Sequence, residues 1–249
     1  MRLLLLNSNT SQFVTDKVTA EARRVALPDT EIVPATGSFG ARVMTTRSEV
    51  AIGEHATLDA LAQHAAGCDA VVIAVSYDSA LSAAREMVGI PVVGITEAAL
   101  LTACMLGSKV GIVVFGRRVL PLYQEVVSLH GMDARVAGWR VVDSNSPYGQ
   151  GDQADADRLT IAAANDLVER DYAEVVILAG AVMAGVPLRL QDQVAVPLLD
   201  GVSCAVPQAE TLVRLARPKA RTGSLSALPK REVVGLSPAL SRYFNGDQA

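Results

Sequence analysis

Short runs of aliphatic and β-branched residues alternate along the chain with segments whose apolar residues follow helical spacing. Residues 71–75 and 174–179 are two such runs, with the composition of strands buried on both faces of a parallel sheet. Each run leads into a short break of polar or small residues, then into a segment of helical spacing, and past a proline into another short strand. The pattern predicts two βαβ units.

The spacing within the two units indicates an internal duplication. Val75 and Pro91 are 16 positions apart, and Gly180 and Pro197 are 17 positions apart. The break in each unit lies at the carboxyl end of a predicted buried strand, which is where open α/β sheets bind their ligands. We therefore expect the two breaks to face a common cleft.

Each unit is preceded by a strand that opens its half of the chain, at residues 3–7 and 110–115. The predicted fold class is α/β, with two pseudo-symmetric Rossmann-like lobes, parallel sheets and a cleft between the lobes. The first lobe is expected to comprise residues 1–98 and 206–249. The second is expected to comprise residues 99–205.

Composition and charge are those of a globular protein of ordinary size. A chain of 249 residues, half of it hydrophobic, can bury a core large enough for two lobes. The formal net charge of -4, without a cluster of Lys and Arg, argues against nucleic acid as the main partner. The short apolar run at residues 3–6 leads straight into Asn7 and Ser8, so no signal peptide or membrane span is expected and a cytoplasmic location is predicted.

The three cysteines are Cys68, Cys104 and Cys204. Their spacing is not that of metal ligands, so no metal site is expected. Because their number is odd and no export signal is expected, we predict reduced thiols.

Polar residues follow the predicted strands at the sheet edge where ligands bind. Asn9 and Thr10 follow the opening strand, where they either contact a ligand or only cap the next helix. Ser76, Tyr77 and Asp78 follow the strand of the first βαβ unit. The Tyr77 phenol could donate a proton or bond a developing oxyanion, or it could only pack in a pocket wall. Ser76 and Asp78 could be helix caps.

Two more segments could touch a ligand. Arg117 and Arg118 lie at the start of a predicted helix, where an arginine could hold an anionic group, although a solvated surface pair is the commoner case. Residues 143–152 form a loop rich in turn-forming residues that could act as a lid, with Tyr148 as its one residue of obvious binding capacity.

Three other segments have a predicted structure. Residues 37–46 have the glycine and threonine content of a flap. A late helix is predicted for residues 208–215. Residues 236–240 are expected to pack back against the first lobe.

Short motifs spread from residue 7 to residue 202 carry a family resemblance. They are Asn7-Ser8-Asn9-Thr10-Ser11, residues 69–86, Ile90-Pro91-Val92-Val93-Gly94-Ile95 with Glu97, Met183-Ala184-Gly185, and Asp200-Gly201-Val202. With them the chain resembles the aspartate/glutamate racemase superfamily, and within it the hydantoin and allantoin racemases most closely. The resemblance implies two α/β lobes, no metal or organic cofactor, and a ligand held between the lobes by loops from both.

The resemblance also implies a chemistry for which this chain lacks the usual groups. Family racemases use one cysteine from each lobe as base and acid on opposite faces of an acidic carbon. Aligned on the neighbouring motifs, those two positions carry Val75 and Gly180, and Val114 and Phe115 replace the paired threonines that help bind substrate oxygens. Racemisation by two thiols is therefore not expected.

If the protein is an enzyme, other residues at these loops stand in for the missing thiols. Ser76, Tyr77 and Asp78 would be the reacting or polarising groups. The residues expected to contact the substrate are Asn9, Thr10, Val75, Val114, Phe115, Gly180, Ala181, Val182 and Met183. Because Val75, Tyr77 and Phe115 make the expected cleft more apolar than in the racemases, we predict a bulkier or less polar ligand than aspartate.

Two functional classes stay open. The first is a cofactor-independent isomerase or lyase that acts on a small carboxylate, a hydantoin or another cyclic amide. The second is a catalytically silent relative that binds a small molecule or steadies an oligomer. The retention of Asn9, Thr10 and Asp78 favours the enzyme. In both classes we expect a small-molecule partner and a homo-oligomer, and neither a membrane nor nucleic acid.

Overall fold

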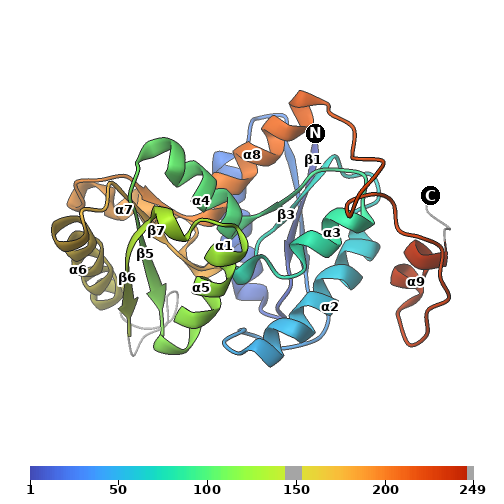
Figure 1. Cartoon of the computed structure of the whole chain (residues 1–249), viewed down its shortest axis with the longest axis horizontal. Helices are drawn as coiled ribbons and strands as arrows, with labels where there is room; N and C mark the ends of the chain where they lie inside the picture. The colour runs from blue at the N-terminus through green and yellow to red at the C-terminus, as the bar shows by residue number, and fades with distance from the viewer. Residues whose placement is uncertain (144–152, 246–249) are drawn as a thin grey trace.

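The computed structural model describes residues 1–143 and 153–245, so the loop at 144–152, including Tyr148, lies outside the described residues. The described chain forms two four-stranded sheets, each in its own α/β lobe, and the lobes lie side by side (Figure 1). Every strand pair in both sheets is parallel. The predicted α/β fold with two pseudo-symmetric lobes is confirmed.

The first sheet has the order β2-β1-β3-β4. Its strands are β1 (Arg2–Asn7), β2 (Glu31–Thr36), β3 (Ala70–Ile73) and β4 (Val92–Gly94). The two central strands are covered on both faces, which is why their sequences are almost continuous aliphatic runs. Leu6 of β1 pairs with Ile73 of β3, so the loops that follow these strands leave the same sheet edge side by side.

The second sheet repeats this arrangement with the order β6-β5-β7-β8. Its strands are β5 (Val110–Phe115), β6 (Val136–Val142), β7 (Val175–Leu178) and β8 (Leu198–Leu199). Val113 of β5 pairs with Leu178 of β7, so the loop after β7 leaves the sheet beside the last residues of β5. The loops after β5 and β7 thus correspond in position to the loops after β1 and β3 in the first sheet.

The helices follow the strands in the alternating order of an α/β fold. They are α1 (Gln12–Val25), α2 (Arg47–His64), α3 (Leu81–Met87), α4 (Ile95–Leu106), α5 (Leu120–Leu129), α6 (Gln153–Asp171), α7 (Val186–Leu190), α8 (Gly201–Leu215) and α9 (Pro238–Asn245). Short 3-10 turns stand between them at η1 (Ser76–Asp78), η2 (Arg117–Val119), η3 (Asp133–Arg135), η4 (Ala181–Met183) and η5 (Gln191–Gln193). Within the described ranges, none of these helices combines the length and hydrophobicity that crossing a bilayer requires.

Helices α4 and α8 join the two lobes. They pack against one another, and the Gln208 side chain of α8 donates hydrogen bonds of 2.8 Å to the Ala98 carbonyl and to the Thr102 hydroxyl of α4. Helix α8 begins at Gly201, not at residue 208 as predicted. Pro207 makes the early part look like a loop, but Asp200 caps the helix and its first two turns are buried. The predicted lobe boundary at residue 206 therefore falls inside this helix.

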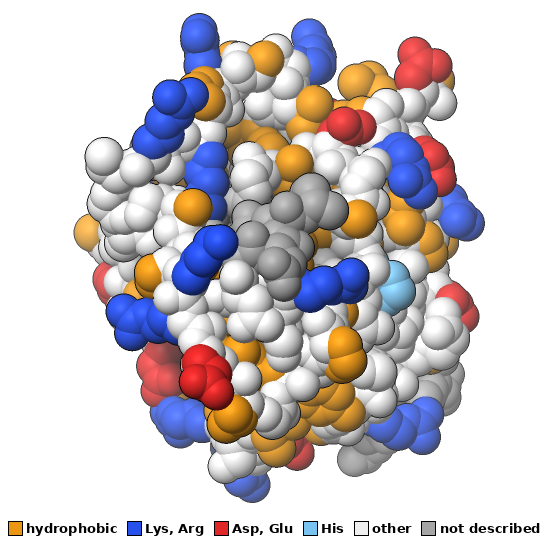
Figure 2. Space-filling model, turned by 90° about the vertical axis from the view of Figure 1, so that its right-hand side faces the viewer, with side chains coloured by type: hydrophobic (Ala, Val, Ile, Leu, Met, Phe, Trp, Pro, Cys, Tyr) orange, Lys and Arg blue, Asp and Glu red, His pale blue; other side chains and the backbone are white. Residues whose placement is uncertain are grey.

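The C-terminal segment returns to the first lobe, as predicted. Leu240 of α9 is buried in the core of that lobe, and the Ser237 hydroxyl donates a hydrogen bond to Asp59 of α2. Figure 1 places α9 beside α2, at the end of the molecule away from the second lobe. Figure 2 looks onto this end, where Lys and Arg side chains stand apart from one another among acidic and apolar ones.

Candidate functional site

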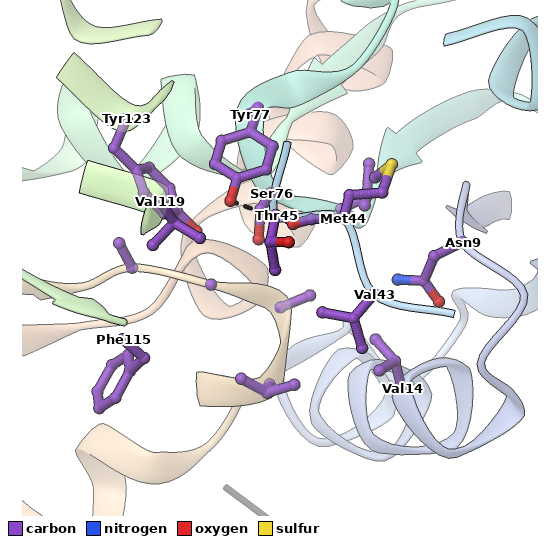
Figure 3. Close-up of a pocket in the computed structure, with 15 residues that line it drawn as sticks. Asn9, Val14, Val43, Met44, Thr45, Ser76, Tyr77, Phe115, Val119 and Tyr123 are labelled. Carbon is purple, nitrogen blue, oxygen red and sulfur yellow. Dashed lines mark hydrogen bonds between the residues drawn. The ribbon is translucent and has the colours of Figure 1, made fainter. Parts of the chain in front are cut away.

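A cavity of about 120 Å³ lies between the lobes, at the carboxyl ends of the central strands. Loops of both lobes contribute to its wall. The lining residues are Asn9, Val14, Val43, Met44, Thr45, Val75, Ser76, Tyr77, Phe115, Val119, Tyr123, Ala179, Gly180, Ala181 and Val182. Figure 3 shows the Tyr77 and Tyr123 rings close together on one side, Asn9 and Val14 on the other, and Ser76 and Thr45 between them.

The first lobe supplies Ser76 and Tyr77 from the turn η1. The backbone of Tyr77 is left-handed, with φ of 67°, and its side chain is 8% exposed. The Tyr77 hydroxyl donates a hydrogen bond of 3.3 Å to the Met44 carbonyl, and this bond ties η1 to the segment at residues 43–45. That segment belongs to the predicted flap, and it forms part of the cavity wall.

The second lobe supplies Gly180 and Tyr123. Gly180 has φ of 122°, a conformation that suits glycine, and it opens the loop after β7. A Cβ atom placed on Gly180 would lie 3.5 Å from the Tyr123 hydroxyl. The phenol of Tyr123, which comes from α5, therefore stands next to the space that a side chain at position 180 would enter.

The two phenols are in contact and are protonated at neutral pH. The centroids of the Tyr77 and Tyr123 rings are 4.8 Å apart. Burial raises the pKa of both hydroxyls above the usual value of about 10, and for Tyr123 a hydrogen bond with Ser76 opposes this rise. At neutral pH both groups are therefore hydrogen-bond donors, and only their minor phenolate forms are bases.

The cavity lining is uncharged. Among the described residues that form it there is no Asp, Glu, Lys, Arg or His side chain, and no thiol. Arg117, a candidate for holding an anion, instead pairs with Asp143 at 2.7 Å and is 88% exposed. The polar atoms that face the cavity thus belong to neutral hydroxyl and amide groups and to the backbone.

Asn9 lies in the cavity wall, but part of its side chain is used within its own loop. Its Oδ1 atom accepts hydrogen bonds from the Ser11 amide at 2.9 Å and from the Asn7 side chain at 3.0 Å. Thr10 does not line the cavity. Its amide donates a hydrogen bond of 3.1 Å to the Ala41 carbonyl and so joins this loop to the flap. Asn9 thus faces the cavity, whereas the predicted capping is not seen, because the N-cap of α1 is Ser11 and no side chain makes a cap hydrogen bond there.

Three other predicted site residues lie outside the lining. Val114 is fully buried in the hydrophobic core, and Met183 is fully buried in the separate core of the second lobe. The Asp78 carboxylate points away from the cavity and accepts hydrogen bonds from the Thr96 and Glu97 amides at 2.8 and 2.7 Å. Asp78 is thus a cap, as the structural alternative predicted, but it caps the distant helix α4.

Sequence patterns did not predict Tyr123, Val119 or Val14 as cavity residues. Tyr123 stands on a buried face of α5 among apolar residues such as Leu122 and Val126. Its helical spacing predicts only packing, and its closeness to Gly180 depends on how the lobes meet. The one available signal was the phenol itself, because a buried tyrosine usually has a hydrogen-bond partner.

The three cysteines lie away from the cavity. Cys68 precedes β3, Cys104 is in α4 and Cys204 is in α8. Burial raises the pKa of Cys204 to about 12 and also raises the pKa of Cys68. Across residues 1–143 and 153–245, His, Cys, Asp and Glu side chains form no group of three or more that could hold a metal ion.

Comparison with known proteins decides the family. A family model described as Asp/Glu/Hydantoin racemase matches residues 3–209. The chain belongs to this family. The Asp/Glu/hydantoin racemase fold accounts for the duplicated lobes and for a cavity built from loops of both. The predicted resemblance to hydantoin and allantoin racemases is likewise supported by individual relatives.

Two bacterial hydantoin racemases align with this racemase-family chain over nearly its full length. The protein from Pseudomonas sp. (strain NS671) is 28% identical over 236 residues, which cover 94% of this chain and 95% of the relative. The protein from Paenarthrobacter aurescens is 30% identical over 226 residues, covering 90% of this chain and 96% of the relative.

Solved structures of racemases in the family superpose closely. Allantoin racemase from Pseudomonas fluorescens has a TM-score of 0.87 and 32% identity, covering 94% of this chain and 100% of that one. Allantoin racemase from Klebsiella pneumoniae has a TM-score of 0.91 and 28% identity, covering 97% and 99%. Arylmalonate decarboxylase, at a TM-score of 0.64 and 15% identity, shares the fold.

Proposed function

We propose that the protein is a cofactor-independent enzyme that acts at the acidic ring carbon of a small, neutral cyclic amide of the hydantoin class. The observation that carries the proposal is the uncharged interlobe cavity, in which one neutral phenol from each lobe, Tyr77 and Tyr123, stands beside the Ser76 hydroxyl. The similarity to hydantoin and allantoin racemases points to the same substrate class.

The cavity favours a neutral substrate over an anionic one. Burying a carboxylate without a cation or several hydrogen bonds costs several kcal/mol. The described lining has no Lys or Arg to compensate such a charge. A cyclic amide has no net charge and presents carbonyl oxygens, which phenols and backbone amides can bind. The ligand is therefore less polar than aspartate.

The chemistry follows from what a neutral phenol can do. When a proton leaves the ring carbon next to a carbonyl, negative charge develops on the carbonyl oxygen. A fixed donor such as Tyr77 or Tyr123 stabilises that charge. The phenolate form of the other tyrosine takes up the proton that leaves carbon, and the phenol so formed then returns a proton to carbon. The route uses no thiol, in keeping with Val75 and Gly180 in the cavity wall and with three cysteines that lie elsewhere.

Among the described residues of the site, no side chain is a good base at neutral pH. A phenol with a raised pKa is almost fully protonated at neutral pH, and a lone serine hydroxyl is a weak base. As long as the pH is below the pKa, each increase of one pH unit raises the fraction of phenolate tenfold. We therefore expect the enzymatic rate of proton exchange to increase about tenfold per unit between pH 7 and pH 9, without a plateau.

The test is hydrogen–deuterium exchange at the acidic carbon in D2O, followed by NMR. The panel comprises 5-substituted hydantoins, allantoin, α-amino acids and arylmalonates, each corrected for exchange without enzyme. Tyr77→Phe and Tyr123→Phe remove one donor each and should lower the rate about 100-fold. The matched control is Tyr172→Phe, because Tyr172 is 79% exposed and lies outside the cavity.

A second function has a specific observation in its favour. Since the described lining offers no group that is a base at neutral pH, the protein could bind a cyclic amide without turning it over. Exchange on hydantoins that falls in both cavity variants supports the enzyme. Thermal shifts with hydantoins but no exchange at any pH from 7 to 9 support the binding protein. Exchange on amino acids alone would contradict the proposed substrate class.

A further inference from the structure

The loop that carries Ser76 and Tyr77 has an unusual backbone. Tyr77, Asp78 and Ala80 all have positive φ, at 67°, 48° and 62°. Residues with a Cβ atom adopt this conformation only where surrounding contacts hold them in it. The position of Tyr77 in the cavity wall therefore depends on what anchors this loop.

Asp78 is the anchor on the side away from the cavity. Its carboxylate is 5% exposed and accepts hydrogen bonds from two amides in the first turn of α4, those of Thr96 and Glu97. Gly94 leaves room for it, because a Cβ atom at position 94 would lie 2.4 Å from the Asp78 Cγ atom. The loop is thus fastened to the helix that connects the lobes.

His130 contacts the same carboxylate from the second lobe. It follows the last turn of α5, and its Nε2 atom lies 3.5 Å from the Asp78 Oδ2 atom. Its Nδ1 atom lies 3.6 Å from the Glu97 Oε1 atom. The Nε2 atom is buried and has no hydrogen-bond partner among the described residues. The carboxylate of Asp78 is the nearest charge to it.

Helix α5 and its C-cap contact two neighbouring residues of the loop, Tyr77 and Asp78. Tyr123 is on α5 and His130, seven positions later, is the C-cap of that helix; seven positions are two turns, so both lie on the same face. Tyr123 packs on the Tyr77 ring, and His130 faces Asp78. A change in the distance between His130 and Asp78 is therefore expected to shift Tyr77, the neighbour of Asp78 in the cavity wall.

The charges around His130 favour its protonated form. The contact with Asp78 raises the pKa of His130, burial opposes this rise, the Glu97 carboxylate adds to it, and the Arg85 guanidinium opposes it. Arg85 is itself held by Glu97, with nitrogen to oxygen distances of 3.1 and 2.5 Å. A contact strengthened by a proton is complete at low pH and is lost as the pH rises through the raised pKa.

We propose that Asp78 and His130 are positioning residues whose contact holds the Tyr77 phenol at the cleft, most firmly when His130 carries a proton. The inference rests on the proposed function, because the group that is positioned is one of its two donors. Neither Asp78 nor His130 touches the cavity.

The experiment follows the two residues directly in the full chain. Histidine and tyrosine rings are labelled with 13C, and their NMR signals are recorded from pH 5.5 to 9.5. Tyr77→Phe and His130→Asn assign the two signals. The signal of Tyr77 is expected to shift with the same midpoint as His130 and to lose this shift in His130→Asn. His64→Asn, which changes a histidine at the exposed end of α2, is the matched control and should leave the shift in place.

Ligand affinity gives a second readout. At pH 6 the dissociation constant of 5-benzylhydantoin should be about five-fold larger for His130→Asn than for the unmodified chain. At pH 9 the two constants should be equal. Asp78→Asn should weaken binding at both pH values, since it removes the anchor charge itself. If Asp78→Asn does not fold, His130→Asn and His130→Gln still test the contact.

The outcomes separate this inference from the proposed function. A Tyr77 signal that ignores the titration of His130, or that follows it unchanged in His130→Asn, overturns the positioning role even if hydantoin exchange is found. The expected NMR coupling together with no exchange on any panel member supports the positioning role and rejects the enzyme.

Discussion

The loops after β3 and β7 occupy corresponding places in the two lobes, but their backbones are built from different residues. Both pass through a 3-10 turn and enter a short helix through a left-handed residue, Ala80 with φ of 62° and Gly185 with φ of 76°. In the second lobe the positive φ angles fall on Gly180 and Gly185. In the first they fall on Tyr77, Asp78 and Ala80.

A carboxylate also ties each loop to the helix that follows the next strand, α4 or α8, but the carboxylate comes from opposite ends of this link. In the second lobe Asp200 is the N-cap of α8 and reaches back to the Gly185 amide at 3.2 Å. In the first lobe the N-cap of α4 is Gly94, and the carboxylate of Asp78 comes forward from the loop. Moving the carboxylate into the loop lets its neighbour Tyr77 face the cavity, at a cost in backbone strain.

The largest effect should come from filling the space beside Asp78. In Gly94→Ala the new Cβ atom meets the Asp78 carboxylate at 2.4 Å, so we expect a loss of about 3 kcal/mol in the free energy of unfolding. Urea denaturation measures it. Gly89→Ala is the control, because a Cβ atom there has nothing within 4 Å. Equal stability of the two variants would show that Asp78 is not a rigid anchor.

A smaller loss is expected at the corresponding loop of the second lobe. Gly185→Ala puts a Cβ atom on a residue with φ of 76° and 2.8 Å from the Glu21 Oε2 atom. Strain and contact together should cost about 2 kcal/mol. Gly131→Ala, with φ of 67° and nothing within 4 Å of the new atom, isolates the strain and should cost about 1 kcal/mol. Identical losses of stability in the two variants would show that the contact with Glu21 contributes nothing.

The reverse substitution in the first lobe should stabilise the protein. Ala80→Gly relieves a left-handed alanine, and after the entropy that glycine adds to the unfolded chain we expect a gain of about 0.5 kcal/mol. Ala83→Gly, inside α3, is the control and should cost about 1 kcal/mol. A loss in Ala80→Gly would mean that the loop is not strained at this residue.

The smallest expected effect is the pH dependence that Asp200 gives to stability. Burial and the charge of Glu21 raise the pKa of Asp200 against the hydrogen bonds from Ser203 and Gly185. A raised carboxyl pKa adds stability at low pH that is lost as the pH rises through it. The Tm of the unmodified chain, relative to Asp200→Asn, should therefore fall by about 2 °C between pH 4 and pH 7. A flat difference would contradict this assignment.

Much of the fold was predictable because it rests on local patterns. The aliphatic runs and the proline spacing define both sheets, and the loop residues Ser76, Tyr77 and Gly180 follow from where those strands end. The start of α8 was missed because Pro207 indicates a break, while the burial that overrides it comes from packing on α4 and the first lobe.

The parts of the site that were missed depend on contacts distant in sequence. Tyr123 reaches the cavity only because α5 of one lobe packs on η1 of the other. Asp78 and His130 are 52 positions apart, and nothing in their local sequence pairs them. Local spacing fixes which face of an element is buried, but not which partner lies against that face.

The hydrogen bond between Tyr77 and Met44 sets up a competition, because a phenol has a single proton to give. In the structure that proton goes to the Met44 carbonyl, 3.3 Å away, and holds residues 43–45 over the cavity. A substrate carbonyl that accepts it leaves the flap with one tether fewer, and the bond between Thr10 and Ala41 remains. A substrate that takes the Tyr77 proton would therefore also weaken the attachment of residues 43–45 to the cavity wall.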